Sequence, residues 1–173
     1  MSLQPDLLTA ANGPEPYTDV STGAAAGAVL LRLGSSRYAV DMADVAEVTP
    51  MPGVTRIPGA AAWLLGVANW RGRMLPVLDL RPLLSATVVP LPSSARMVVL
   101  ARDGLVVGLV AEAVPGVHDE SLHDLSPPPP TLTVEAARLV AGQVLDRSGP
   151  VAVLDVTAVL ALRERVDPRR HRA

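Results

Sequence analysis

The sequence predicts an all-β fold with short helices, built as two small barrels that pack together. β-Favouring runs alternate with turn residues, and the first pair, Val29–Leu33 and Arg37–Val40, is separated by Gly34–Ser36 as in a hairpin. The sequence also echoes itself, because LPVLDLRPLL at residues 75–84 and VAVLDVTAVL at residues 151–160 align with one constant offset. Two copies are too few for a solenoid, so the echo favours a pair of similar packed subdomains.

The segments between these landmarks follow in chain order. VGLVAEAVPGV at residues 107–117 repeats the apolar positions of YAVDMADVAEV at residues 38–48, which adds a second echo. Asp41–Val48 favours a short helical turn or a bent strand, and the prolines and glycines between residues 50 and 59 forbid a long regular element there. Thr133–Leu139 is compatible with a short helix.

The composition of the ends and connections suggests the domain organisation. Residues 1–27 mix Pro, Gly, Ser, Thr and Ala without periodicity, which predicts a flexible leader before a folded domain at residues 28–162. The Arg-rich residues 163–173 are expected to form a flexible tail, and residues 88–94 a loop. The four prolines at 127–130 could form a polyproline II ligand, but a stiff connector is the favoured interpretation.

The overall composition excludes several classes of protein. A chain of 173 residues with 49% hydrophobic content suits one domain or two small intertwined ones. The formal net charge of −2 gives no electrostatic footprint for nucleic acid, so nucleic acid is not an expected partner. Cysteine is absent, which excludes disulfides, thiol catalysis and Cys-based zinc sites.

Hydropathy gives an expectation for the cellular location. The longest uncharged apolar run, near residues 59–68, is about ten residues long, whereas roughly 18 are needed to span a bilayer. The N-terminus has no basic segment before an apolar one, so it does not predict a secretory signal. We expect a cytoplasmic protein without direct membrane insertion.

Two aspartates are the first candidates for catalysis. Asp79 and Asp155 occupy equivalent places in the repeated V-L-D segments, and paired carboxylates are the catalytic groups of aspartic proteases. Neither aspartate is followed by the small hydroxyl residue and glycine that such a dyad uses. Capping of the short helices LRPLL and VTAVL is therefore favoured, with a carboxylate-dependent hydrolase as a distant alternative.

The remaining chemical signals are weak. His118 and His123 lie among Asp and Glu residues, so a surface metal site is conceivable, but no strong third ligand stands out and solvated loop histidines are favoured. The sequence contains no phosphate-cradling glycine loop, no dinucleotide fingerprint and no Ser-His-Asp order. The sequence therefore predicts a non-enzyme that uses no metal and no cofactor.

The most distinctive segment is Leu64–Leu84, LLGVANWRGRMLPVLDLRPLL, in which one polar corner joins two apolar runs. Because Asn and Gly tolerate backbone angles that other residues resist, this corner predicts a tight hairpin turn shaped by Asn69 and Gly72. Arg71 is expected to project its planar five-donor guanidinium from the turn. An ordinary exposed turn arginine is the alternative.

The corner lies inside GSSRYAVDMADVAEVTPMPGVTRIPGAAAWLLGVANWRGRMLPVLDL, which resembles the CheW-like domain of bacterial chemotaxis adaptors. The resemblance runs from about Ala28 to about Leu162 and includes, in order, YAV, DVAEV, TRIPG, GVAN-RG, PVLDL and GLVV with its following VAEAV. Agreement across many spaced elements is more specific than one short motif. The resemblance implies two intertwined SH3-like five-stranded barrels around a shared hydrophobic core.

The resemblance also implies a function and a set of binding residues. It implies a non-catalytic adaptor that couples the cytoplasmic tips of chemoreceptors to the regulatory domain of a CheA-type histidine kinase in signalling arrays. Arg71 matches a receptor-facing position, and Glu47 matches an acidic position expected to hold it in a bidentate pair. The positions that match the kinase-facing segment are Val45, Val48, Val54 and Ile57.

Several of these assignments have structural alternatives. Each of the four kinase-facing residues could instead belong to the core, and Glu47 could be a solvated charge at a strand end. Trp70 stands where the family usually has an aliphatic residue, and its indole could either pack inward or add contact area at the receptor interface. Glu112 stands where the family more often has Asp. For the whole chain, an adaptor of a non-flagellar chemosensory-like pathway, such as pilus motility or developmental control, is the nearer alternative.

Overall fold

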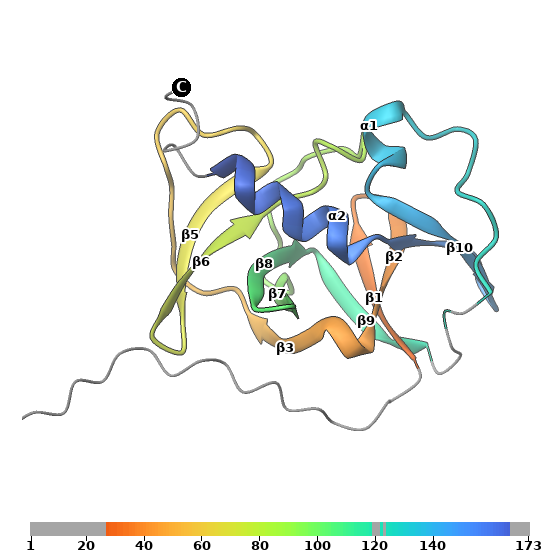
Figure 1. Ribbon diagram of the computed structural model, residues 1–173, viewed down its shortest axis with the longest axis horizontal. Helices are drawn as coiled ribbons and strands as arrows, with labels where there is room; N and C mark the ends of the chain where they lie inside the picture. The colour runs from red at the N-terminus through yellow and green to blue at the C-terminus, as the bar shows by residue number, and fades with distance from the viewer. Residues whose placement is uncertain (1–26, 119–121, 123, 167–173) are drawn as a thin grey trace, which may run out of the picture.

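A computed structural model describes residues 27–118, 122 and 124–166 and contains two antiparallel-rich sheets with short helices (Figure 1). The first sheet has the order β10 (Val140–Asp146), β11 (Gly149–Leu154), β2 (Ser36–Asp41), β1 (Ala28–Leu33) and β9 (Ala113–His118). The second has the order β3 (Val45–Pro50), β7 (Arg96–Arg102), β8 (Leu105–Ala111), β6 (Arg73–Leu78), β5 (Leu64–Trp70) and β4 (Val54–Thr55). The helices are η1 (Met42–Asp44), α1 (Val134–Ala137), α2 (Val156–Ala161) and η2 (Leu162–Val166). The all-β prediction is confirmed.

The two sheets exchange strands reciprocally. After the β1–β2 hairpin the chain leaves the first sheet, and β3 pairs with β7 at the edge of the second. After the β7–β8 hairpin the chain returns, and β9 pairs with β1. Each sheet also contains one parallel pair, β6 beside β8 and β11 beside β2. The repeated sequence segments thus occupy equivalent positions in two sheets of the same order, and the short β4 extends only the second.

One core holds both sheets together. Its largest cluster takes Leu31 and Val40 from the first sheet and Leu78 and Leu100 from the second, all fully buried. Helix α2 lies across the junction of the sheets in Figure 1 and adds Leu160 to the same cluster. Burying a side chain of this size contributes about 1.5–3 kcal/mol. The shared core therefore makes the two sheets one folding unit.

The helix ends test the capping predictions. Asp155 accepts a hydrogen bond from the Ala158 N–H at 3.0 Å and caps α2, as predicted, and Thr133 caps α1 in the same way. For LRPLL the predicted helix is wrong, because residues 80–84 form a single turn, although Asp79 Oδ1 does accept a hydrogen bond from the Arg81 N–H at 3.1 Å. Ser85 takes a left-handed φ of 56° immediately after that turn, so the segment cannot continue as a right-handed helix.

A buried charge cluster explains the different role of Asp79. Arg81, 3% exposed, donates to both Asp79 carboxylate oxygens at 2.9 and 2.8 Å and to Glu112 Oε1 at 2.8 Å. Its Nη1 also donates to the carbonyl of Val89, and Glu112 accepts from the Gly34 N–H. The hydrogen bond with Asp79 raises the pKa of the Arg81 guanidinium, which stays charged. The charge cluster therefore connects the turn after β6 to the place where the chain passes from β8 in the second sheet to β9 in the first.

A second buried carboxylate, that of Asp44, lies where the chain passes from β2 in the first sheet to β3 in the second. Asp44, 5% exposed, precedes β3 and accepts from Arg102 through both carboxylate oxygens, at 2.7 and 2.5 Å. Arg102 also donates to the Thr157 hydroxyl at the start of α2. A buried carboxylate therefore stands at the beginning of each exchanged strand, Asp44 before β3 and Glu112 before β9.

An ion pair between β2 and the β10–β11 hairpin predicts a pH dependence. The hydrogen bond from Arg37 lowers the pKa of Asp146, helped by the Ser148 N–H. A lowered folded pKa adds stability above the unfolded value of about 3.9, and this stability disappears as the pH falls through the folded pKa. We expect Asp146→Asn to be less stable than wild type at pH 6 and equally stable near pH 2 in urea titrations. A difference that stays constant with pH, or that persists unchanged in an Arg37→Gln background, would contradict this assignment.

Some expectations fall on residues that the structure does not describe. The predicted leader lies outside the described residues apart from Gly27, and so does the predicted tail after Val166. The first residues assigned to that tail, 163–166, lie in η2. Of the helices in the described ranges, none combines the length and the apolar character that a membrane crossing requires.

Candidate functional site

The polar corner forms the tip of the β5–β6 hairpin, at the lower left of Figure 1. Trp70 pairs with Arg73, so Arg71 and Gly72 make up a two-residue turn with φ of 51° and 79°. Two left-handed residues are the signature of a type I′ turn. The Asn69 side chain accepts a hydrogen bond from the Gly72 N–H at 3.0 Å. The predicted hairpin is present, but Arg71, and not Asn69, takes the unusual backbone angle.

An arginine is an unusual choice for this place in the turn. The β7–β8 hairpin has the same turn with Asp103 and Gly104, at φ of 51° and 77°, and Asp is among the residues that favour the left-handed conformation. A long side chain there costs on the order of 1 kcal/mol. Asn would suit position 71 of the turn at least as well as Arg, so the turn geometry does not account for the arginine.

Two neighbours hold the Arg71 guanidinium. Its Nη2 lies 3.0 Å from Oε2 of Glu47, and its carbon lies 5.3 Å from the centre of the Trp70 ring. The same Glu47 oxygen accepts the indole N–H of Trp70 at 2.7 Å. The Glu47–Arg71 ion pair is therefore present, but through the Nη2–Oε2 contact and not in the expected bidentate form, and the acceptor oxygen is shared with the indole. The Arg71 side chain is 70% exposed and that of Glu47 is 31% exposed.

The four predicted kinase-facing residues do not share one environment. Val48 on β3 and Ile57 after β4 are 40% and 38% exposed. Val45 is half-buried against the shared core, and Val54 is half-buried against a second cluster under the β5–β6 hairpin. Strands β3 and β4 are the two edges of the second sheet. Val48 and Ile57 are therefore accessible at the surface, whereas Val45 and Val54 are partly covered by packing.

Sequence reasoning missed one exposed apolar side chain beside the tip. Met74 on β6 pairs with Asn69 and is 63% exposed. The alternation along β6, with Leu75 and Val77 buried and Met74 and Pro76 outside, could have identified it. Met74 therefore presents a flexible apolar side chain at the surface close to the tip of the hairpin.

The catalytic alternatives find no support in the placement of their residues. Asp79 is buried with both oxygens bonded to Arg81, and Asp155 caps α2, so neither carboxylate is available to share a proton with the other. His118 ends β9, and His123 lies outside the described residues. Within the described ranges, no three His, Cys, Asp or Glu side chains are grouped as a metal site would need.

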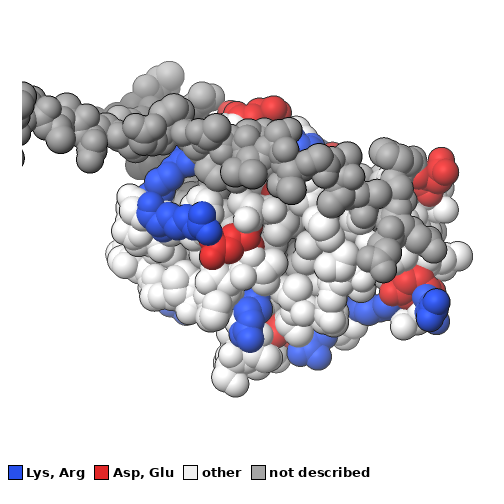
Figure 2. Space-filling model, turned by 90° about the horizontal axis from the view of Figure 1, so that it is seen from below, with Lys and Arg blue, Asp and Glu red and all other residues white. Residues whose placement is uncertain are grey.

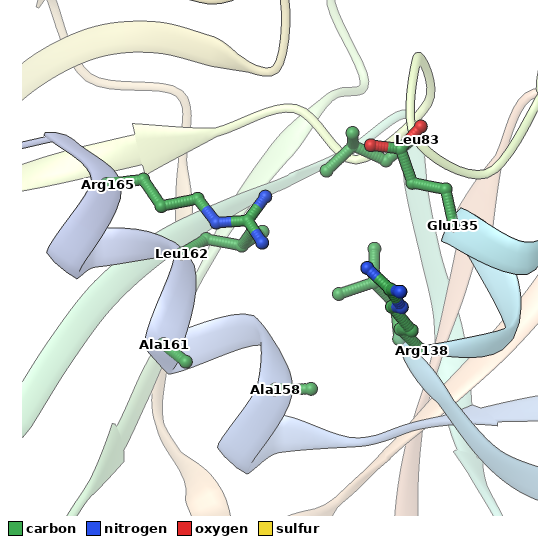
Figure 3. Close-up of a pocket in the computed structure, with 8 residues that line it drawn as sticks. Leu83, Glu135, Arg138, Ala158, Ala161, Leu162 and Arg165 are labelled. Carbon is green, nitrogen blue, oxygen red and sulfur yellow. The ribbon is translucent and has the colours of Figure 1, made fainter.

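A groove lies between α1 and the α2–η2 segment (Figure 3). Its volume is about 220 Å³. In the close-up, Arg138, which follows α1, and Arg165 from η2 approach it from opposite sides, and Ala158 and Ala161 line the α2 wall. Its lining combines leucines and alanines with Glu135 and these arginines, which gives no nucleophile and base pair. The groove has no features of an active site.

Figure 2 shows how the charged side chains of the described residues are spread over one face. On the face seen in Figure 2, arginines and carboxylates lie in small separate groups divided by uncharged side chains. That face carries no continuous basic area of the kind that tracks a phosphate backbone.

Comparison with known proteins agrees with this fold. The CheW-like domain family matches residues 27–164. Protein PilI of Pseudomonas aeruginosa is 31% identical over 128 residues, which cover 74% of this chain and 71% of that protein. Chemotaxis protein CheW of Klebsiella aerogenes is 26% identical over 136 residues, which cover 79% of this chain and 82% of that protein.

A solved structure gives the same result for the fold. The crystal structure of the scaffolding protein TtCheW from Thermoanaerobacter tengcongensis matches with a TM-score of 0.68 at 24% sequence identity, over 79% of this chain and 88% of that one. The SH3-like fold implied by the sequence is thereby confirmed. Because the family matches nearly the whole described chain, this protein belongs to the CheW-like domain family of non-catalytic chemotaxis-type signalling adaptors.

Proposed function

We propose that the chain couples chemoreceptors to a CheA-type histidine kinase and binds the receptor tip through the β5–β6 hairpin. The main support for this proposal is the geometry of Arg71. This exposed arginine takes a left-handed turn conformation and lies against Glu47 and Trp70. A side chain that the turn disfavours, yet that is fixed in direction, is what a preorganised contact requires. Asn69 and Gly72 shape the turn that aims it.

The kinase contact is proposed for the edge strands of the same sheet. Val48 and Ile57 would make the direct contacts, with Val45 and Val54 packing beneath them. Neighbouring residues on a strand point to opposite faces, so Glu47 can serve the hairpin while Val48 serves the kinase. Strand β3 would then carry a residue of each binding surface.

This function places the protein on the cytoplasmic side of the membrane, recruited to receptor arrays through its partners. Each contact would be modest, and assembly would gain strength from effective concentration. A non-flagellar output is a second proposal, motivated by the similarity to Protein PilI. Neighbouring genes distinguish the two outputs, because flagellar and non-flagellar systems would each bring their own genes.

Arg71→Asn tests the receptor surface. Asn suits the type I′ turn, so we expect the free energy of unfolding in urea to stay level or rise by about 0.5–1 kcal/mol. Receptor capture from lysate of the source bacterium should fall at least about tenfold, as for loss of a central Arg contact, with the kinase still captured. Mass spectrometry identifies the captured proteins.

The matched control is Arg73→Asn, which removes the same charge two residues along the hairpin. We expect it to retain receptor capture. Equal capture of receptor by wild type and Arg71→Asn would show that Arg71 is an ordinary turn residue. Capture of neither receptor nor kinase by wild type would overturn the coupling function. Val48→Asp and Ile57→Asp should reduce kinase capture and leave receptor capture unchanged.

A further inference from the structure

The indole of Trp70 links two parts of the second sheet that do not pair. Trp70 is 6% exposed and packs in a cluster with Leu75, Val77 and Val99. A buried indole N–H needs an acceptor, and Glu47 Oε2 supplies it at 2.7 Å. In the strand order, β3 with Glu47 stands at one edge and β5 with Trp70 stands four places along. The hydrogen bond therefore fixes the Glu47 carboxylate from inside the fold.

Arg71 depends on the same two groups. An exposed ion pair alone is worth little and leaves a long side chain free to turn. Here the Glu47 oxygen that Arg71 meets at 3.0 Å is already held by the indole, and the guanidinium lies 5.3 Å from the ring centre of that indole. One rigid side chain thus supplies the stacking surface and also immobilises the acceptor.

We propose that Trp70 is the positioning residue of the receptor contact, which fixes the direction of Arg71 by holding Glu47 through its N–H and by stacking under the guanidinium. This inference rests on the proposed receptor-binding function. Trp70 touches the partner little, since it is buried. Its effect is preorganisation, because an arginine ordered in advance loses less rotamer freedom when the receptor binds.

A double-mutant cycle separates positioning from packing. The probe is the purified cytoplasmic fragment of the chemoreceptor identified by the capture experiment, titrated against wild type, Trp70→Phe, Arg71→Asn and the double variant. Phe keeps the ring and removes the N–H donor. We expect Trp70→Phe to weaken binding about five- to tenfold in the wild-type background and to have no effect once Arg71 is Asn.

The matched control is Trp63→Phe, at the only other tryptophan of the chain, which packs against the shared core. It should leave receptor affinity unchanged. If Trp70→Phe weakens binding equally with and without Arg71, then Trp70 acts through packing and the positioning role is overturned. Circular dichroism and urea titration establish that each variant is folded under the binding conditions.

A spectroscopic measurement tests the positioning without the receptor. The two indole N–H groups give separate cross-peaks in a ¹H–¹⁵N spectrum, and Trp63→Phe assigns them. Glu47→Gln replaces the charged acceptor by a neutral one, so the Trp70 cross-peak should move while that of Trp63 stays. An unmoved Trp70 cross-peak would overturn the positioning role. If instead the Trp70 cross-peak moves but Arg71→Asn binds receptor with normal affinity, the proposed receptor-binding function of Arg71 is wrong, while the hydrogen bond between Trp70 and Glu47 is still supported.

Discussion

Replacing Arg81 by Met is expected to destabilise the folded chain by about 3–5 kcal/mol, because it leaves buried carboxylates without their cation. Asp79 and Glu112 are 4% and 6% exposed and both accept hydrogen bonds from Arg81. The Val89 carbonyl would also lose a donor. A loss of this size is a large part of the 5–15 kcal/mol total of a typical domain. Urea unfolding followed by circular dichroism measures it.

The companion variant replaces the whole charge cluster by apolar residues of similar size, with Asp79→Leu, Arg81→Met and Glu112→Met together. Apolar replacement of a complete buried ion cluster is often neutral or stabilising, so this triple variant should recover most of the lost stability. If Arg81→Met alone costs less than about 1 kcal/mol, the carboxylates reach water or protons in the variant and the cluster is not the anchor described here.

Gly66→Ala is expected to detach β4 from β5, at a cost of at least about 2 kcal/mol. Gly66 has a φ of 151°, and a Cβ there would stand 2.2 Å from the Thr55 carbonyl oxygen. Pairing of β4 with β5 holds Val54 and Thr55 in place, so the segment that carries Ile57 should shift. Kinase capture should fall while receptor capture through the hairpin tip persists.

Gly53→Ala is the matched control for Gly66→Ala. Gly53 lies in the same region just before β4, and a Cβ there would meet nothing within 4 Å. We expect Gly53→Ala to leave both stability and kinase capture close to wild type. Normal kinase capture by a folded Gly66→Ala variant would separate β4 from the kinase surface and leave Val48 on β3 as the remaining support for that proposal.

The sequence predicts the fold well wherever the signal is local or repeated. The β1–β2 hairpin, the α2 cap at Asp155 and the tight turn at Arg71 each depend on a few neighbouring residues, and each is present. The two-barrel architecture depends on the V-L-D echo, which places β6 and β11 in equivalent positions. Local turn residues and the internal repeat are therefore sufficient to predict most of the architecture.

The features that escaped prediction depend on contacts distant in sequence. LRPLL was predicted as a helix capped by Asp79, but Arg81 captures both carboxylate oxygens and Ser85 ends the turn. The strand β4 exists only through its pairing with β5. Similarly, the indole N–H of Trp70 finds its acceptor in Glu47, 23 residues away. No local pattern could specify these partners.

The reciprocal exchange of strands has a consequence for how the chain folds. The β1–β2 hairpin is flanked by β9 on one side and β11 on the other, so its sheet stays open until residues 113–118 and 149–154 have been synthesised. Neither half of the chain can complete a barrel from its own residues. Non-local pairing of this kind slows folding and exposes unpaired edges to other nascent chains. Each half of the chain therefore needs strands from the other half to complete its sheet.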